Sequence, residues 1–190
     1  MADRTHSFIN TTVALKGAGA NPYAVDFGAQ FSANITGTAY PGRVMHLNSV
    51  GAFELGASGT QVPIYNAINS KGLGASNFDG ASVSAIPTGR GYGLVAVAGY
   101  EIQTTEYDKT AGVVYAPNDL LHAPTEAQIT GDKTLAGTLY KTKTWPGGAT
   151  GALTLYTDAV CGQVSRPPGI LNQWGQTTLS YWTFYFPGTA

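Results

Sequence analysis

Short segments in which hydrophobic and polar residues alternate run through most of the chain. In residues 43–48, Val44, His46 and Asn48 alternate with residues that face the opposite way. The longest such segment covers residues 93–107, where apolar residues at every second position from Leu94 to Ile102 would share a core face. A period of two is the signature of β-strands, so both segments are expected to be strands.

Gly- and Pro-rich turns separate further candidate strands. These strands are expected at residues 52–55, 61–68, 112–117, 133–145, 152–157 and 159–166. Turn chemistry is found at Pro117-Asn118-Asp119, Pro146-Gly147-Gly148 and Pro167-Pro168-Gly169. Short strands with breaks every ten or so residues predict an all-β fold, either a β-sandwich of jelly-roll type or a Greek-key barrel. No helix of normal length is expected, only short turns near residues 66–68 and 119–122.

The C-terminal segment, residues 179–186, is the most aromatic part of the chain. Alternation places Trp182 and Phe184 on one face and Tyr181 and Tyr185 on the other. We expect the Trp/Phe face to belong to the core. The Tyr face has two open interpretations, since it could pair with neighbouring strands or meet a partner, an environment that suits tyrosine.

Residues 1–37 differ from the body, residues 38–190. Their apolar residues, including Phe27 and Phe31, are scattered among Gly, Ala and Asn without a sustained period. One interpretation makes them edge strands of the body. The other makes them an extended N-terminal arm that gains order by lying on a neighbouring molecule.

The composition limits the function classes. Only 11% of the 190 residues are charged and the net charge is −1, which disfavours a nucleic-acid binder because phosphates require a basic surface. No apolar run reaches the length of a membrane span, and the N-terminus lacks the pattern of a signal peptide. Cys161 is the only cysteine, so no internal disulfide is expected. We therefore expect a protein made in the cytoplasm.

The sequence contains little that indicates catalysis. His6, His46 and His122 lie in unrelated contexts, and Cys161 in an apolar segment is expected to be a buried, inert thiol. One local acidic group could bind calcium, but alternation turns its side chains to opposite faces; its members are Glu101, Glu106 and Asp108. A glycosidase would need two carboxylates facing each other across a cleft. We expect no catalytic residues, no bound metal and no cofactor.

Several longer segments resemble one family. The segments are residues 99–108 (GYEIQTTEYD), 115–120 (YAPNDL), 162–166 (GQVSR) and 179–182 (LSYW). Together with the hairpin-like stretch that starts near residue 43, they are similar to the decoration, or cement, proteins of tailed-phage heads. The Pro167-Pro168 pair departs from the glycine that follows Ser-Arg in that pattern, and the first forty residues match nothing in it.

The resemblance implies a structural role. Such a protein would sit on the outer surface of the virion, bind the major capsid protein and copies of itself as a dimer or trimer, and stabilise the shell without catalytic residues. As candidate partner contacts we single out Tyr181, Tyr185, Trp174, Phe27 and Phe31. The alternative function is a glycan- or receptor-binding surface module, in which Trp145 and Trp174 would stack on sugar rings rather than anchor loops.

Overall fold

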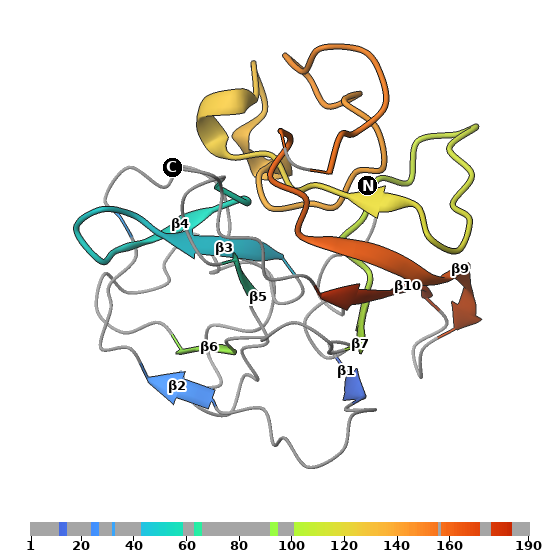
Figure 1. Ribbon diagram of the computed structural model, residues 1–190, viewed down its shortest axis with the longest axis horizontal. Coiled ribbons are helices and arrows are strands. Elements are labelled where there is room, and N and C mark those ends of the chain that lie inside the picture. Colours follow the sequence, from blue (N-terminus) through green and yellow to red (C-terminus); the bar gives the residue numbers. More distant parts are fainter. Residues whose placement is uncertain are drawn as a thin grey trace.

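The computed structural model describes residues 12–14, 24–26, 32, 43–58, 63–65, 92–94, 101–155, 157–171 and 176–183. Its strands form two five-stranded sheets in which all pairs of strands are antiparallel (Figure 1). The helices among these residues are two short 3-10 turns, Glu126–Gln128 (η5) and Lys133–Leu135 (η6). The all-β prediction is therefore confirmed. None of the helices in this part of the chain is long and apolar enough to cross a membrane.

The first sheet contains the C-terminal strands. Its strands are, in spatial order, β1 (Thr12–Ala14), β7 (Glu101–Thr104), β10 (Thr177–Thr183), β9 (Gly162–Leu171) and β8 (Leu120–Leu121). The central strand β10 pairs with both β7 and β9, with Tyr181 opposite Ile102 on one side and Val164 on the other.

The second sheet is built around a hairpin. Its strands are, in spatial order, β2 (Ala24–Asp26), β6 (Tyr92–Leu94), β5 (Pro63–Tyr65), β3 (Val44–Leu47) and β4 (Phe53–Leu55). The hairpin between β3 and β4 has Leu47 opposite Phe53, and the side chain of Asn48 accepts hydrogen bonds from the backbone of its turn. The strands predicted at residues 43–48 and 52–55 are confirmed.

One hydrophobic core joins the hairpin to the first sheet. Val44 and Ala57 belong to the same buried cluster as Ile102, Val164 and Tyr181. Backbone hydrogen bonds link the hairpin region to the segment between β7 and β9, from Val44 N–H to Gly137 O and from Ala57 N–H to Ala123 O. The segment between β7 and β9 thus packs against both the hairpin and the first sheet.

Two N-terminal segments lie at sheet edges. Strand β1 pairs with β7, with Thr12 opposite Gln103, and strand β2 pairs with β6, with Ala24 opposite Leu94. These are the positions that the edge-strand interpretation predicts. Most of residues 1–37 lies outside the described residues, so the arm stays a prediction.

The single long strand predicted at residues 93–107 is wrong. Its two ends belong to different sheets, as β6 and β7, and residues 95–100 lie outside the described residues. A strand of fifteen residues would be about 50 Å long, far longer than strands of ordinary domains.

The strands predicted at residues 112–117, 133–145 and 152–157 are also wrong. Among the described residues, the last two segments form isolated bridges instead, which are Tyr107–Leu139, His122–Tyr140 and Thr142–Ala152. Glycines with positive φ lie at the start of the first segment, Gly112 at 92°, and inside the second, Gly137 at 79°, and such values break a strand. Strand β8, conversely, forms where only a short turn was expected.

Pro167-Pro168-Gly169, predicted as a turn, lies inside β9. Arg166 is opposite Ser180 and Ile170 is opposite Thr178, so three residues of β9 oppose one residue of β10. Proline has no N–H to donate, and an irregularity of this kind accommodates it within a sheet.

The expected core face of the C-terminal strand is wrong as well. Leu179, Tyr181 and Thr183 are fully buried, whereas Trp182 is only half-buried. Gly162, which lies against the Tyr181 ring, leaves the space that this ring fills. Both faces of β10 carry large apolar side chains, so alternation alone does not identify the face that packs inward.

Candidate functional site

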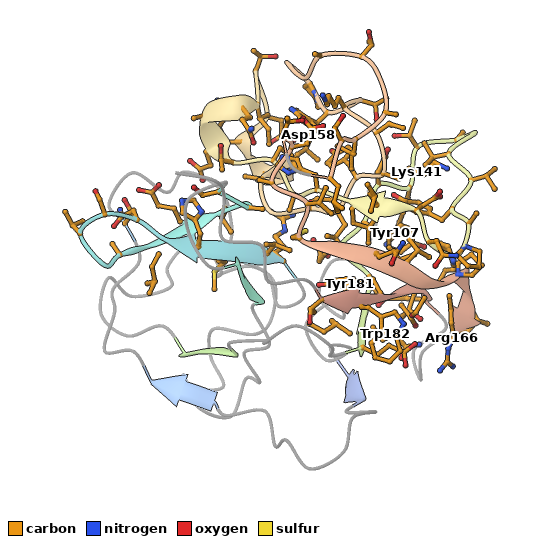
Figure 2. All side chains as sticks on the ribbon, viewed as in Figure 1. Tyr107, Lys141, Asp158, Arg166, Tyr181 and Trp182 are labelled. Atoms are coloured by element: carbon orange, nitrogen blue, oxygen red, sulfur yellow. The ribbon has the colours of Figure 1, made fainter. Side chains whose placement is uncertain are left out.

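Glu101 connects two strands that are not adjacent in the sheet. Its carboxylate accepts hydrogen bonds from Ser165 Oγ at 2.8 Å and from Arg166 Nη2 at 3.3 Å. Because β10 lies between β7 and β9, this contact passes over β10. The Glu101 side chain is 6% exposed and that of Arg166 is 47% exposed, and Arg166 lies at the periphery of the molecule (Figure 2). The contact fixes the spacing of three strands.

Glu106 forms a second, more deeply buried ion pair. Arg43 Nε donates to Glu106 Oε2 at 2.9 Å, and Arg43 Nη1 donates to the carbonyl oxygen of Ala136 at 3.1 Å. Arg43 is 1% exposed. A buried charge of this kind needs a partner, so the pair ties the start of β3 to the chain that follows β7.

Asp108 is used differently from the other two acids. Its Oδ1 accepts hydrogen bonds from the backbone N–H of Thr110 at 3.0 Å and from Thr110 Oγ1 at 2.6 Å. The three acidic residues of the predicted local group therefore have separate partners. Within the described ranges, no group of three His, Cys, Asp or Glu side chains could hold a metal ion.

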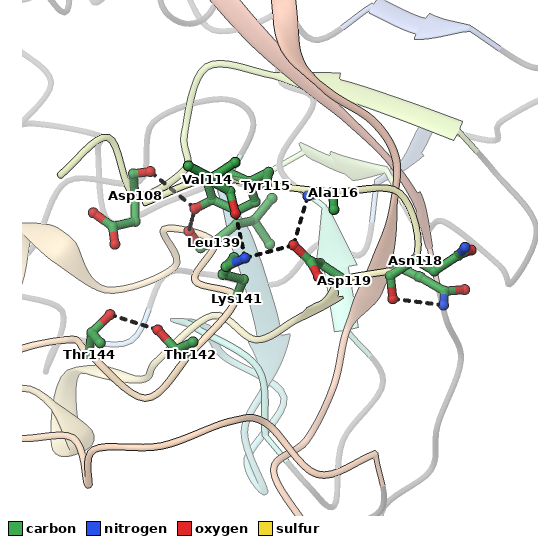
Figure 3. A network of polar contacts seen from close by, with 11 residues as sticks. Asp108, Val114, Tyr115, Ala116, Asn118, Asp119, Leu139, Lys141, Thr142 and Thr144 are labelled. Carbon is green, nitrogen blue, oxygen red and sulfur yellow. Dashed lines mark hydrogen bonds and ion pairs between the residues drawn. The ribbon is translucent and has the colours of Figure 1, made fainter. Parts of the chain in front are cut away.

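The loop of residues 109–118 is held in place by polar contacts (Figure 3). Tyr115 Oη donates to the carbonyl oxygen of Asp108 at 3.1 Å, and Asp119 Oδ2 accepts from the backbone N–H of Ala116 at 2.8 Å. Lys141 Nζ pairs with Asp119 at 3.0 Å and donates to the carbonyl oxygen of Val114. The loop therefore presents Val114 in a fixed position, with its side chain 73% exposed.

The predicted partner contacts are not assembled into one surface by the described residues. Tyr181 is fully buried, so the expectation that it faces a partner is wrong. The reason is that the face of β10 that packs inward is the one opposite to the expected face, so the Tyr181 ring lies in the core. Tyr185, Trp174, Phe27 and Phe31 lie outside the described residues, and their roles stay predictions.

Trp145 is an anchor of its loop. The residue is 6% exposed, and its ring lies 4.9 Å from that of His122 and 5.8 Å from that of Tyr140, centroid to centroid. Sugar stacking by Trp145 is therefore excluded, and the loop-anchoring interpretation is confirmed for this residue. Burial also lowers the pKa of His122, whose Nδ1 and Nε2 lie 3.2 Å and 3.3 Å from Ala159 O and Gln128 Oε1.

Cys161 is buried, as predicted. Its thiol donates to the carbonyl oxygen of Leu121, and burial raises the pKa of the thiol to about 12. A thiol that stays protonated and inaccessible does not act as a nucleophile at neutral pH.

Sequence reasoning missed Val114 and Lys141. Val114 was assigned to a strand, although turn residues on both sides, Gly112 and Pro117, could have indicated a loop. Nothing in the local sequence connects Lys141 with a carbonyl oxygen 27 positions earlier. No family model, curated protein or solved structure matches the chain.

Proposed function

We propose that this chain is a structural virion protein that binds the outer surface of a tailed-phage capsid and stabilises the shell through contacts with the major capsid protein. The proposal starts from the resemblance of residues 99–108, 115–120, 162–166 and 179–182 to decoration proteins. The partner would be the major capsid protein, and copies of the chain would associate at the symmetry axes of the shell.

The observation that carries the proposal is the contact between Glu101 and Ser165-Arg166. These residues come from two separate segments of the resemblance, 64 and 65 positions apart, and they bind each other. Residues 101–104, 120, 162–166 and 179–182 lie on four strands of the same sheet. Hydrogen bonds between residues of these resembling segments support a role in building a rigid scaffold more than a role in catalysis.

Val114 supports a contact at the loop of residues 109–118. An apolar side chain that is 73% exposed on a loop fixed by Lys141 and Asp119 can dock without a large loss of conformational entropy. Many copies on one shell would also allow each contact to be weak. We therefore place the capsid-facing contact at this loop.

The test uses tailed-phage heads assembled from the major capsid protein alone. Added chain should co-sediment with expanded heads, saturate at a fixed number of copies per head and raise the temperature at which the heads disrupt. Val114→Asp should reduce occupancy at least about tenfold, because burying an unpaired carboxylate in a contact is costly. Val50→Asp, at the β3–β4 turn where Val50 is 84% exposed, is the matched control and should bind normally.

Two results would count against the proposal. Failure of the unmodified chain to bind expanded heads would remove the capsid function itself. Normal binding by Val114→Asp with loss of binding by Val50→Asp would keep the function but move the contact to the hairpin turn.

A further inference from the structure

A polar cavity of about 540 Å³ opens beside the Arg43–Glu106 ion pair. Its lining includes Arg43, Glu106, Asp108, Lys109 and Tyr140. The volume lies within the range of sites that bind small ligands or single side chains. We call it the polar cavity.

Among the described residues, Asp108 is a buried carboxylate of this cavity without a basic partner. The residue is 9% exposed, and the two hydrogen bonds to its carboxylate both come from Thr110 and end on Oδ1. Among the described residues, no Lys, Arg or His nitrogen lies within 4.0 Å of its carboxylate. Figure 3 shows the carboxylate turned away from Tyr115 and Lys141. Buried carboxylates are normally paired with a cation.

Glu106 and Tyr140 add hydrogen-bonding capacity to the same cavity. Glu106 is 8% exposed and uses Oε2 for Arg43, while its Oε1 accepts no hydrogen bond in the described part of the structure. Tyr140, a residue that is 5% exposed, also lines the cavity with its side chain, which carries a hydroxyl group. The charge of Asp108 helps to raise the pKa of Tyr140, after the larger effect of burial, which is consistent with the two groups sharing the cavity.

The charges in the cavity favour a cationic ligand. The cation of Arg43 is matched by Glu106 at 2.9 Å, which leaves Asp108 as the buried charge without a counterion. Lys109 lies at the exposed mouth, with its ammonium 5.1 Å from the centre of the Tyr107 ring, where solvent screens its charge.

A sugar is less suited to the cavity than a cation. Lys109 lies over the Tyr107 ring, and Tyr107 and Tyr140 are both buried, at 7% and 5% exposure. Neither ring therefore offers an open face on which a sugar could stack. The acceptor oxygens of Glu106 and Asp108 instead match the N–H donors of an ammonium or guanidinium group.

We propose that the polar cavity binds a lysine or arginine side chain of a partner polypeptide, with the carboxylates of Asp108 and Glu106 as acceptors and the Tyr140 hydroxyl as a third contact. This binding site is proposed independently of the capsid function. Its test uses no phage heads, so the failure of one proposal leaves the other standing.

The test titrates the isotope-labelled full chain with N-acetyl-argininamide and follows backbone amide shifts. We expect saturable shifts at residues 108–110 and 140, with a Kd of about 1–10 mM for so small a probe. The citrulline analogue has nearly the same shape but no charge, and it should bind at least about tenfold more weakly. N-acetyl-lysinamide should bind at the same residues.

Variants identify the acceptor. Asp108→Asn should weaken binding of the arginine probe at least about tenfold. Glu54→Gln is the matched control, since Glu54 lies outside the cavity beside His46, and it should leave binding unchanged. Tyr140→Phe, which keeps the ring, should weaken binding about threefold and replaces Asp108→Asn if that variant does not fold.

The proposal is overturned by any of three results. These are the absence of saturable shifts up to about 50 mM probe, equal binding of the citrulline analogue, and unchanged binding in both Asp108→Asn and Tyr140→Phe.

Discussion

Gly162 lies directly against the ring of Tyr181. A Cβ atom at Gly162 would come within 2.6 Å of Tyr181 Cδ2 and within 2.7 Å of the carbonyl oxygen of Trp182. Both neighbours belong to the central strand of the first sheet, and Tyr181 is fully buried. The two residues therefore form a matched contact in which the absence of a side chain on one makes room for the ring of the other.

Gly162→Ala should lower the free energy of unfolding by about 1–3 kcal/mol, because the added methyl group overpacks the core. Urea unfolding would measure the change. Gly169→Ala on the same strand is the control, since a Cβ there meets nothing within 4 Å, and it should change stability by less than about 0.5 kcal/mol. Equal effects of the two substitutions would contradict the close approach of Gly162 and Tyr181.

Tyr181→Ala should destabilise the fold by about 3–5 kcal/mol, as deletions of large buried aromatic side chains do. Trp182→Ala should cost clearly less, because Trp182 is only half-buried. Thermal melting of the two variants side by side would establish which face of β10 forms the core. A larger loss of thermal stability for Trp182→Ala would instead support the prediction from the sequence pattern that the Trp182 face of β10 forms the core.

Glu106→Gln should cost about 3–5 kcal/mol, because it removes the carboxylate that pairs with the buried guanidinium of Arg43. Glu54→Gln is the matched control. The Glu54 side chain is 33% exposed beside His46, so its replacement should cost no more than about 1 kcal/mol. Chemical unfolding of both variants at neutral pH would test the difference, and similar losses would show that burial of Arg43 carries no penalty.

Stability should fall at alkaline pH. Burial raises the pKa of Tyr140 from 10.0 to about 12 and that of the Cys161 thiol from 9.0 to about 12. The folded state holds these two protons more tightly than the unfolded state. Their contribution to the free energy of unfolding is therefore complete below about pH 9 and is lost progressively up to about pH 12. Tyrosinate absorbance, followed together with circular dichroism, would measure it.

The matched variant for this effect is Tyr140→Phe, which removes one of the ionising groups. It should flatten the decline of stability between about pH 10 and pH 12. An unchanged decline in this variant would indicate that Tyr140 ionises in the folded protein as readily as in the unfolded chain.

Local patterns predicted the all-β class and the hairpin of β3 and β4, because strand alternation and turn residues act over a few positions. They failed between β7 and β9, where the chain is held by contacts such as Lys141 with Val114 O that have no periodic signature. The facing of β10 could not be read either, since both of its faces carry large apolar side chains.

The candidate site was predictable only in part. The pattern singled out Glu101, Glu106 and Asp108 as one acidic group and expected their side chains to diverge, and the structure gives each of them a separate partner. The identity of those partners depends on residues such as Arg43, 63 positions from Glu106, which only the tertiary fold brings together.

The prolines within β9 also have a consequence for how the protein behaves at high concentration. In the part of the chain that the structure describes, β8 and the two residues before it cover only residues 162–164 on the outer edge of β9. An open strand edge can recruit a strand from another molecule and start aggregation. Pro167 and Pro168 interrupt the row of donors that such an intruding strand would need. The same residues that distort the pairing with β10 thus help to keep densely packed copies from joining edge to edge.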